Sequence, residues 1–343
     1  MNTTNKKIIP IFFATDDNYA PFLVVTLESI FANASKDYQY NIHVLTNGLN
    51  DDSIAKIDKY KNENVVIDYV NMHDKMEEMG NALHTRDYYS KATYFRLFAP
   101  KMFPEYDKAL YLDCDIIVRG DISDLYNYDI KNNLVGAVPD EAVANVPEFI
   151  AYTDNFLNVE SKRYFNAGIL IMNMKELRNI NFESRFINLL TAYTFNVAQD
   201  QDYLNVICKD RVYYLPKTWN KMPIPDSKLK LENLNLIHYN LSYKPWHFDG
   251  ILYENEFWKY AYATNVIDDI LLHKLNYTSD KQERDLECGK RLIVMAYEQS
   301  LMEDSFKNLV TNGKMNLEEI FSKGNDFINN CDIIQEKKLN GWL

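Results

Sequence analysis

Apolar segments of strand length alternate along the chain with segments in which apolar residues recur at helical spacing. Residues 8–15, 40–47 and 64–72 form apolar runs, and residues 50–62 carry a helical repeat between the last two runs. Another helical repeat follows the first run, at Leu23, Leu27, Ile30 and Phe31. Near-continuous apolar runs are typical of strands that are buried on both faces. The order of strands and helices therefore predicts a parallel sheet covered by helices.

Three further apolar runs of strand length extend this pattern to about residue 240. They lie at residues 108–118 (KALYLDCDIIV), 133–140 (NLVGAVPD) and 165–174 (FNAGILIMNM). We therefore expect an α/β fold with a doubly wound, mainly parallel central sheet and helices on both faces.

The alternation ends after Gly250, and the pattern that follows is helical. We expect two units, a domain at residues 1–250 and a C-terminal helical subdomain at residues 251–343. An apolar stripe in the second unit predicts a packing face, either against the first unit or against another subunit in a homo-oligomer. The stripe consists of Leu317, Ile320, Phe321, Phe327 and Ile328.

Charge and composition exclude several kinds of partner. The 343 residues include 49 acidic and 37 basic side chains, for a net charge of -12, so nucleic acid and anionic membranes are not expected as partners. The N-terminal apolar stretch is too short for a signal peptide and is broken by Pro10, and no later window approaches a membrane span. The four cysteines form no C-x-x-C pair, which argues against zinc and fits a reducing compartment. We expect a cytoplasmic protein without a transmembrane segment.

Polar residues gather where the predicted strands end. They stand at residues 14–19 (ATDDNY), 113–115 (DCD) and 138–141 (VPDE), and again at residues 199–203 (QDQDY), where a helix is expected to begin. Ligands of open α/β sheets bind in the crevice beyond the carboxyl ends of the strands. These segments are therefore the candidates for a binding site.

Asp113 and Asp115 suggest a divalent cation. Side chains two residues apart point to the same face of an ideal strand, and a turn that begins at the strand end can aim both carboxylates at one cation. Two ionised carboxylates this close repel each other unless a cation or a proton intervenes. The alternative is structural, with Asp113 as a solvated strand end and Asp115 as the cap of the next turn.

Taken together, several stretches resemble glycosyltransferase family 8, the retaining group that includes bacterial lipooligosaccharide galactosyltransferases and glycogenin. They occur in the family's order between about residues 7 and 250. The resemblance implies a GT-A type nucleotide-sugar-binding fold, a divalent cation (Mn²⁺ or Mg²⁺), and retaining transfer of glucose or galactose from a UDP-hexose to a glycan acceptor. The stretches are FFATDDNYAPFLVVTLESI, TYFRLFAPKMFPEYDKALYLDCDIIVRGDISDLY, YFNAGILIMNMKELR, QDQDYLN and IHYNLSYKPWH.

The resemblance also assigns residues to the nucleotide. Thr15, Asp16, Asn18 and Tyr19 would hold the base and ribose, with Tyr19 stacked on uracil. Asp17 and Asn18 have a structural alternative, because they could cap the helix that follows. Arg96 would lie near the donor, although an arginine on a helix is often only a surface ion-pair partner.

The same resemblance assigns a second group of residues to the cation and the diphosphate. Asp113, Asp115 and His238 would be the protein ligands of the metal, with Cys114 between the aspartates as a small apolar filler. Lys244 would place a positive charge at the diphosphate.

The resemblance assigns a third group of residues to the donor hexose. Asp140, Asn166, Ala167, Asp200 and Gln201 would surround the sugar. Gln201 would stabilise oxocarbenium-like charge in a front-face attack, although Asp202 would be the better nucleophile for a double displacement. The alternative for QDQDY is a polar helix N-terminus whose acids favour the helix dipole.

Leu241 departs from the family, which commonly has glycine three residues after the metal histidine. We expect Leu241 to be extended and turned away from the phosphates, with Lys244 as the main phosphate contact.

The acceptor is less defined than the donor. A glycan on a protein, polysaccharide or lipid is expected, and Trp219, Tyr243 or Trp246 could form a sugar platform or belong to the core. Two rival functions are a catalytically silent nucleotide-sugar-binding partner protein and a phosphatase of the haloacid dehalogenase type, whose D-x-D normally lies on the first strand.

Overall fold

The centre of the fold is a seven-stranded sheet with the strand order β3-β2-β1-β4-β7-β6-β8. The computed structural model describes residues 6–79, 83 and 91–323. Strand β7 is antiparallel to both of its neighbours, whereas the other pairings are parallel, so the expected mainly parallel α/β sheet is confirmed. The strands are β1 (Lys7–Ala14), β2 (Tyr38–Thr46), β3 (Val65–Asn71), β4 (Ala109–Leu112), β6 (Val135–Pro139), β7 (Phe165–Met172) and β8 (Val212–Tyr214).

The apolar run at residues 108–118 is not one strand. It divides into β4 and β5 (Ile116–Val118), and β5 leaves the central sheet to pair antiparallel with β9 (Leu236–His238). Ile116 faces His238 in this second sheet. The break falls at residues 113–115, so the two aspartates lie between the two sheets, where the chain changes direction.

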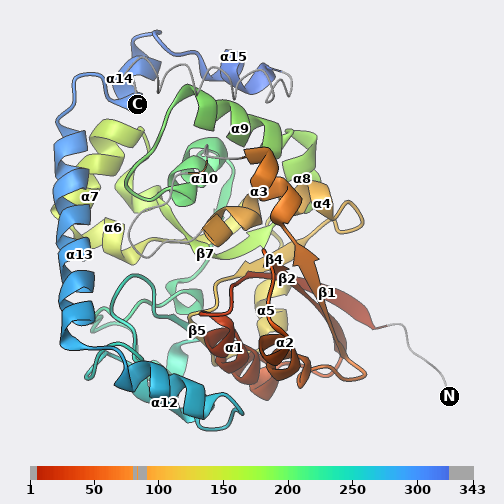
Figure 1. Ribbon diagram of the computed structural model, residues 1–343. Coiled ribbons are helices and arrows are strands. Elements are labelled where there is room, and N and C mark those ends of the chain that lie inside the picture. Colours follow the sequence, from red (N-terminus) through yellow and green to blue (C-terminus); the bar gives the residue numbers. More distant parts are fainter. Residues whose placement is uncertain (1–5, 80–82, 84–90, 324–343) are drawn as a thin grey trace.

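Helices cover both faces of the central sheet (Figure 1). Helices α1 (Ala20–Asn33), α2 (Asp51–Asp58) and α5 (Ile122–Asn127) lie on one face. The strands alternate accordingly, because Ile11 and Phe13 of β1 pack in the cluster on the α1 side and Phe12 packs in the cluster on the other side. The helices on that other face are α3 (His73–Met79), α4 (Ala99–Met102), α8 (Met174–Asn179), α9 (Phe182–Ala192) and α10 (Asp200–Cys208).

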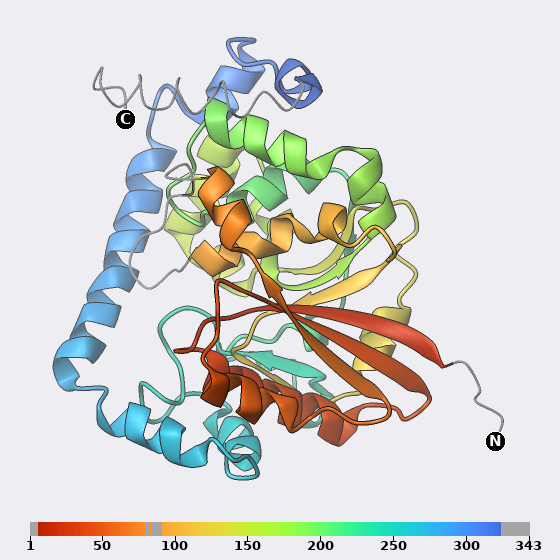
Figure 2. The same ribbon diagram turned by 45° about the vertical axis from the view of Figure 1, so that its right-hand side comes forward.

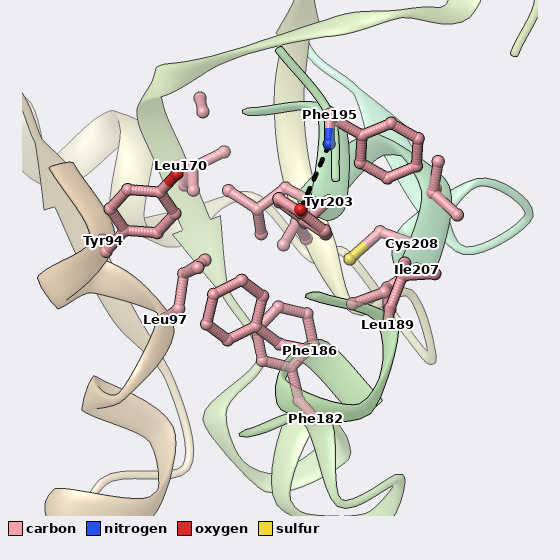
Figure 3. Close-up of a cluster of buried hydrophobic side chains, with 14 of the residues drawn as sticks. Tyr94, Leu97, Leu170, Phe182, Phe186, Leu189, Phe195, Tyr203, Ile207 and Cys208 are labelled. Carbon is pink, nitrogen blue, oxygen red and sulfur yellow. Dashed lines mark hydrogen bonds between the residues drawn. The ribbon is translucent and has the colours of Figure 1, made fainter. Parts of the chain in front are cut away.

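The core under α9 and α10 is dense in aromatic side chains (Figure 3). Phe186 packs edge-on against Tyr203 with ring centroids 5.3 Å apart. The Tyr203 hydroxyl has a polar partner as well, because it accepts a hydrogen bond from the Phe195 backbone N–H at 3.2 Å. This packing fixes α10, whose first turn reaches the pocket described below.

A polar stripe on α1 forms hydrogen bonds with the backbone at and beside β5. The Thr26 hydroxyl donates to the Cys114 and Ile116 carbonyls at 2.8 and 3.0 Å. Ser29 accepts from the Val118 N–H at 3.0 Å, and Asn33 donates to the Val118 carbonyl at 3.0 Å. Because β5 has left the central sheet, these side chains supply partners for its backbone.

Between residue 250 and residue 323, where the described part of the chain ends, there are five helices, and the longest, α13, runs along one edge of the molecule (Figures 1 and 2). Of the predicted stripe, Leu317, Ile320 and Phe321 lie on α15, which packs on α9 of the same chain. Phe327 and Ile328 lie outside the described residues, and the division at Gly250 and the homo-oligomer stay predictions. The helices are α11 (Glu254–Ala261), α12 (Ile267–Leu275), α13 (Ser279–Ser300), α14 (Phe306–Thr311) and α15 (Leu317–Ser322).

Shorter helical segments complete the part of the chain that the structure describes. None of the helices in this part is long and apolar enough to cross a membrane. Among them are α6 (Glu141–Asn145) and α7 (Pro147–Ala151), which continues into the π-helix η2 (Tyr152–Leu157). The 3-10 segments are η1 (Lys91–Leu97), η3 (Ser161–Arg163), η4 (Lys217–Trp219) and η5 (Leu231–Asn233).

Candidate active site

One pocket of about 320 Å³ collects every residue that the family resemblance assigned to the nucleotide, the cation, the diphosphate and the donor hexose. It lies beyond the carboxyl ends of the parallel strands, which is where the polar segments were expected to meet. The assigned residues that line it are Thr15, Asp16, Asn18, Tyr19, Arg96, Asp113, Cys114, Asp115, Asp140, Asn166, Ala167, Asp200, Gln201, His238 and Lys244.

Asp113, Asp115 and His238 form a group that could hold a metal ion, because one ligand atom of each lies within 4.8 Å of the others. His238 Nε2 is 3.2 Å from Asp115 Oδ1 and 3.7 Å from Asp113 Oδ2. The break between β4 and β5 turns both carboxylates toward the imidazole. The Asp115 side chain is only 11% exposed and the cap of α5 is Asp121, so the structural alternative for Asp115 is wrong.

The chemistry of the three side chains fits a hard divalent cation. Asp115 Oδ1 is buried and makes no hydrogen bond to any described residue. A buried acceptor without a donor costs about 1–3 kcal/mol, and a cation at this point would remove that cost. Two carboxylate oxygens and one imidazole nitrogen are a donor set that Mn²⁺ accepts.

Gly168 makes this group possible, although sequence reasoning passed over it. A Cβ on Gly168 would lie 2.4 Å from Asp113 Oδ2 and 2.5 Å from His238 Cε1. Any side chain would therefore push the ligand atoms apart. Its N-terminal neighbours Asn166 and Ala167 were predicted as site residues, but nothing in the sequence indicated that the third position must stay empty.

Lys244 lies against the same carboxylate group. Its ammonium donates to Asp115 Oδ2 at 2.5 Å and to the Tyr239 carbonyl at 2.7 Å, and the side chain is buried. Burial alone would raise the pKa of Asp115, but Lys244 and His238 together hold that pKa well below its usual range. Asp115 is therefore ionised at neutral pH.

Arg96 is not a surface residue, so the alternative of a surface ion pair is wrong. It is 4% exposed, and its guanidinium stacks on Tyr111 at 4.2 Å. It pairs with Asp113 Oδ1 at 3.3 Å and with Asp200 Oδ2 at 3.1 Å, and it also donates to the Ala167 carbonyl. Arg96 thus joins the metal group to the side of the pocket that carries Asp200.

A buried network occupies that side of the pocket. Asp140 Oδ2 accepts from Asn166 Nδ2 at 3.0 Å and from Gln201 Nε2 at 3.2 Å. Gln201 Oε1 accepts from the Ala167 N–H at 2.9 Å, so both ends of this amide are held. Sequence reasoning missed one member, Asn220, which follows η4 and bonds both Asn166 and His238.

Asp200 lies in the first turn of α10, as the alternative for QDQDY expected, and also faces the pocket. Burial raises its pKa to about 7, with Asp113 and Asp202 adding to the shift and Arg96 opposing it. Its Oδ2 is buried and is ion-paired with Arg96 Nε, but that N–H donates to the Thr93 carbonyl, so Oδ2 makes no hydrogen bond to any described residue. This oxygen can therefore still accept a hydrogen bond from a ligand hydroxyl.

Asp202, the alternative nucleophile, does not line the pocket, unlike its neighbours Asp200 and Gln201. It is fully buried, and its carboxylate accepts from the hydroxyls of Tyr164 and Tyr152 at 2.7 and 2.9 Å. It also accepts from the Ala198 N–H at 2.9 Å. The residue holds two tyrosines of the pocket wall in position instead.

The turn after β1 carries the residues assigned to the nucleotide. Tyr19 is the N-cap residue of α1 and has no side-chain cap, so the expected capping by Asp17 or Asn18 is wrong. Asp16 Oδ1 instead accepts from the Tyr19 N–H at 3.1 Å, and Asp17 accepts from the Asn50 N–H at 3.0 Å. Lys244 lies 5.9 Å from the Tyr19 ring centroid, so the turn faces the metal group.

The expectation that Leu241 is extended is wrong, whereas its orientation relative to the phosphates stays a prediction. Its φ is 58°, in the left-handed region that favours glycine, and the residue lines the pocket. The chain reverses here so that Lys244 can reach back to the Tyr239 carbonyl. The backbone has kept the conformation that a glycine would adopt without strain.

Two of the three aromatics that could have formed a sugar platform belong to the core. Trp219 and Trp246 are buried, and Trp246 stacks on Phe22 with centroids 4.0 Å apart. Tyr243 is 54% exposed. A further wall of the pocket, which the sequence did not indicate, comes from Phe149 of α7 and Leu292 of α13.

Comparison with known proteins shows which family this chain matches. The sequence profile described as "Glycosyl transferase family 8" matches residues 10–250. A lipopolysaccharide 1,2-glucosyltransferase of Escherichia coli is 26% identical over 285 residues, which cover 76% of this chain and 79% of that relative.

Two solved structures share the fold. The galactosyltransferase LgtC in complex with donor and acceptor sugar analogues has a TM-score of 0.62 and 28% identity, covering 75% of this chain and 96% of LgtC. The bifunctional glycosyltransferase WbbM has a TM-score of 0.68 and 26% identity, covering 80% of this chain and 53% of WbbM. The GT-A type fold expected from the sequence is thereby confirmed.

Proposed function

The chain belongs to glycosyl transferase family 8 and is a hexosyltransferase, and we propose that it transfers glucose or galactose from a UDP-hexose to a glycan with retention of configuration. The observation that carries the proposal is the convergence of Asp113, Asp115 and His238, with a buried unpaired carboxylate oxygen, inside the pocket that holds all other assigned residues.

The three converging side chains would hold Mn²⁺ or Mg²⁺. When bound, the cation would supply Lewis-acid stabilisation of the charge that builds on the UDP leaving group. Lys244 would add a second positive charge beside the diphosphate. Thr15, Asp16, Asn18 and Tyr19 would hold uridine, with Tyr19 stacked on the base.

Asp140, Asn166, Ala167, Asp200 and Gln201 would surround the hexose. The two held ends of the Gln201 amide support a stabilising role for Gln201, because a side chain held at both ends can present a dipole in a fixed direction. Asp202 is buried beneath tyrosines, which argues against a double displacement through that carboxylate. We therefore favour front-face attack.

The relatives support a glycan acceptor. One is named for lipopolysaccharide glucosyl transfer, and another is a galactosyltransferase. A glycoprotein, a polysaccharide or a lipid-linked glycan would each suit the proposal, which also keeps the cytoplasm as the location and the residues after 250 as a separate helical subdomain.

A donor hydrolysis screen tests the proposal without knowledge of the acceptor. UDP-glucose, UDP-galactose and UDP-N-acetylglucosamine are each incubated with the protein and Mn²⁺, and released UDP is measured with and without a chelator. Chelator-sensitive release from one of the hexose donors is expected. Tight UDP binding without any release would favour the silent binding protein instead, and cleavage of a simple phosphomonoester would favour the phosphatase.

A further inference from the structure

We propose that Asn220 is a positioning residue that holds a proton of His238 on Nδ1, so that Nε2 is the nitrogen left for the cation. The inference rests on the proposed cation site. Asn220 is buried at the end of η4, and its amide lies between Asn166 and His238.

The direction of the hydrogen bonds follows from Asp140, the N-cap residue of α6. A carboxylate only accepts hydrogen bonds. Asp140 Oδ1 accepts from the Ala142 and Val143 N–H groups, both at 3.0 Å. The neighbour at Asp140 Oδ2, 3.0 Å away, must then be the NH₂ group of Asn166.

A backbone group confirms this orientation of Asn166 independently. Its Oδ1 accepts from the Gly168 N–H at 3.0 Å, which an NH₂ group could not do. The atom of Asn220 that lies 3.0 Å from the same Oδ1 must therefore be Nδ2, the donor of its amide. The remaining atom of that amide, Oδ1, points at His238.

His238 Nδ1 lies 3.0 Å from Asn220 Oδ1, and the only proton that can join them is on the imidazole. Nδ1 is therefore protonated, which leaves Nε2 as the nitrogen that can bind a cation beside Asp113 and Asp115. The backbone keeps the pair in register, since the His238 N–H donates to the Lys221 carbonyl at 2.9 Å.

Loss of Asn220 would allow a competing arrangement. With no acceptor at Nδ1, the proton of His238 could move to Nε2, where Asp115 Oδ1 lies 3.2 Å away and accepts it. That hydrogen bond would occupy the two atoms that the cation needs. The hydrogen bonds of Asp140 and Asn166 on the sugar side of the pocket would thus influence how well His238 binds a metal on the other side.

Mn²⁺ titration of the full-length protein, followed by electron paramagnetic resonance without any donor, tests the inference. Asn220→Leu has nearly the same size but neither bonds His238 nor donates to Asn166, and we expect it to bind Mn²⁺ about 10–100-fold more weakly than the parent. Asn220→Asp keeps an acceptor for Nδ1–H and should recover most of that loss. Asn188→Leu, which removes another buried asparagine outside the pocket, should bind Mn²⁺ as the parent does.

The histidine tautomer can also be read directly in the parent. Nitrogen-15 NMR of the metal-free protein should show a proton on Nδ1 of His238, so the inference can be tested even if a variant fails to fold. Parent-like Mn²⁺ affinity in Asn220→Leu, or an Nδ1 without a proton in the parent, would overturn it. A parent that binds no Mn²⁺ would instead remove the cation site proposed above.

Discussion

The two ends of the pocket are held together in different ways. At the nucleotide end, the Thr15 hydroxyl donates to the Asp16 carbonyl and Asp16 accepts from the Tyr19 N–H, so these side chains bond the backbone of their own turn. At the hexose end, Asp140 bonds partners 26 and 61 residues away along the chain. Side-chain bonds within the turn are prominent at the first end, although Asp17 also reaches Asn50, whereas long-range bonds between side chains connect the second end.

This difference determines how far a substitution acts. A change in the nucleotide turn should stay within the turn, because few of its side-chain bonds leave it. A change among the buried amides should spread, because Asn166 and Asn220 connect the hexose end to His238. The metal group lies between the two ends and should affect both.

The largest effect is expected where the two ends meet. Asp113→Asn should reduce Mn²⁺-dependent donor hydrolysis by about 10³-fold, because the amide is a poor ligand for a hard cation and leaves Arg96 with less charge to pair. Released UDP measures the rate, and circular dichroism checks the fold. A folded Asp113→Asn protein with parental turnover would show that the carboxylate group has no catalytic metal.

The hexose end can be separated from the nucleotide end through Asp200. Asp200→Asn should slow transfer by about 10²-fold, because it loses a charge-assisted contact to the sugar, and UDP with Mn²⁺ should still bind nearly as in the parent. Calorimetry measures the affinity for UDP, and hydrolysis assays measure the rate. Weak UDP binding with an unchanged rate would place Asp200 at the nucleotide instead.

Replacement of Lys244 should instead affect the binding of the nucleotide. Lys244→Ala should weaken UDP binding by about 1.5–3 kcal/mol, because a charged hydrogen bond to the diphosphate is lost. Lys274→Ala is a matched control, since Lys274 donates to the Pro245 carbonyl of the same loop but does not line the pocket. Equal losses in both variants would mean that loop position matters and the Lys244 charge does not.

Asp200 should also influence stability through pH. Burial, opposed by Arg96, raises its pKa to about 7, so between about pH 4 and pH 7 the folded state keeps a proton that the unfolded chain has lost. The free energy of unfolding of the parent therefore falls as pH rises through this interval. Asp200→Asn should gain about 1–3 kcal/mol on the parent between pH 5 and pH 8 in urea unfolding. Parallel pH curves would contradict the shifted pKa.

The smallest effect is expected at Leu241. Leu241→Gly should raise the free energy of unfolding by up to about 1 kcal/mol, because glycine adopts a φ of 58° without strain, and it should change UDP affinity little. Leu241→Ala removes the same side chain but keeps Cβ, and should show no such gain. A gain in both variants would point to the side chain and away from the backbone.

Much of the site could be predicted because parallel strands end at one edge of a sheet. The segments at residues 14–19, 113–115 and 138–141 were recognised as strand ends, and all three meet in the pocket. The doubly wound sheet followed from the apolar runs in the same manner. Both features depend on patterns within single segments, which the sequence displays directly.

The remaining features depend on contacts between segments. Gly168 and Asn220 are ordinary residues whose importance comes from neighbours at Asp113, Asn166 and His238, and neither stands in a pattern that marks it. The division between β4 and β5 was missed because the apolar run continues across it. Leu241 was judged by its own preference, whereas the closure of the turn determined its φ.

The polar stripe of α1 restricts the number of residues that precede Thr26 in this helix more than it restricts their types. Thr26, Ser29 and Asn33 each meet a particular backbone group between Cys114 and Val118. Inserting one residue between β1 and Thr26 within the helix would rotate the stripe by about 100° and separate all three side chains from β5. Across relatives, this stretch should therefore accept exchanges of residue type far more readily than insertions or deletions.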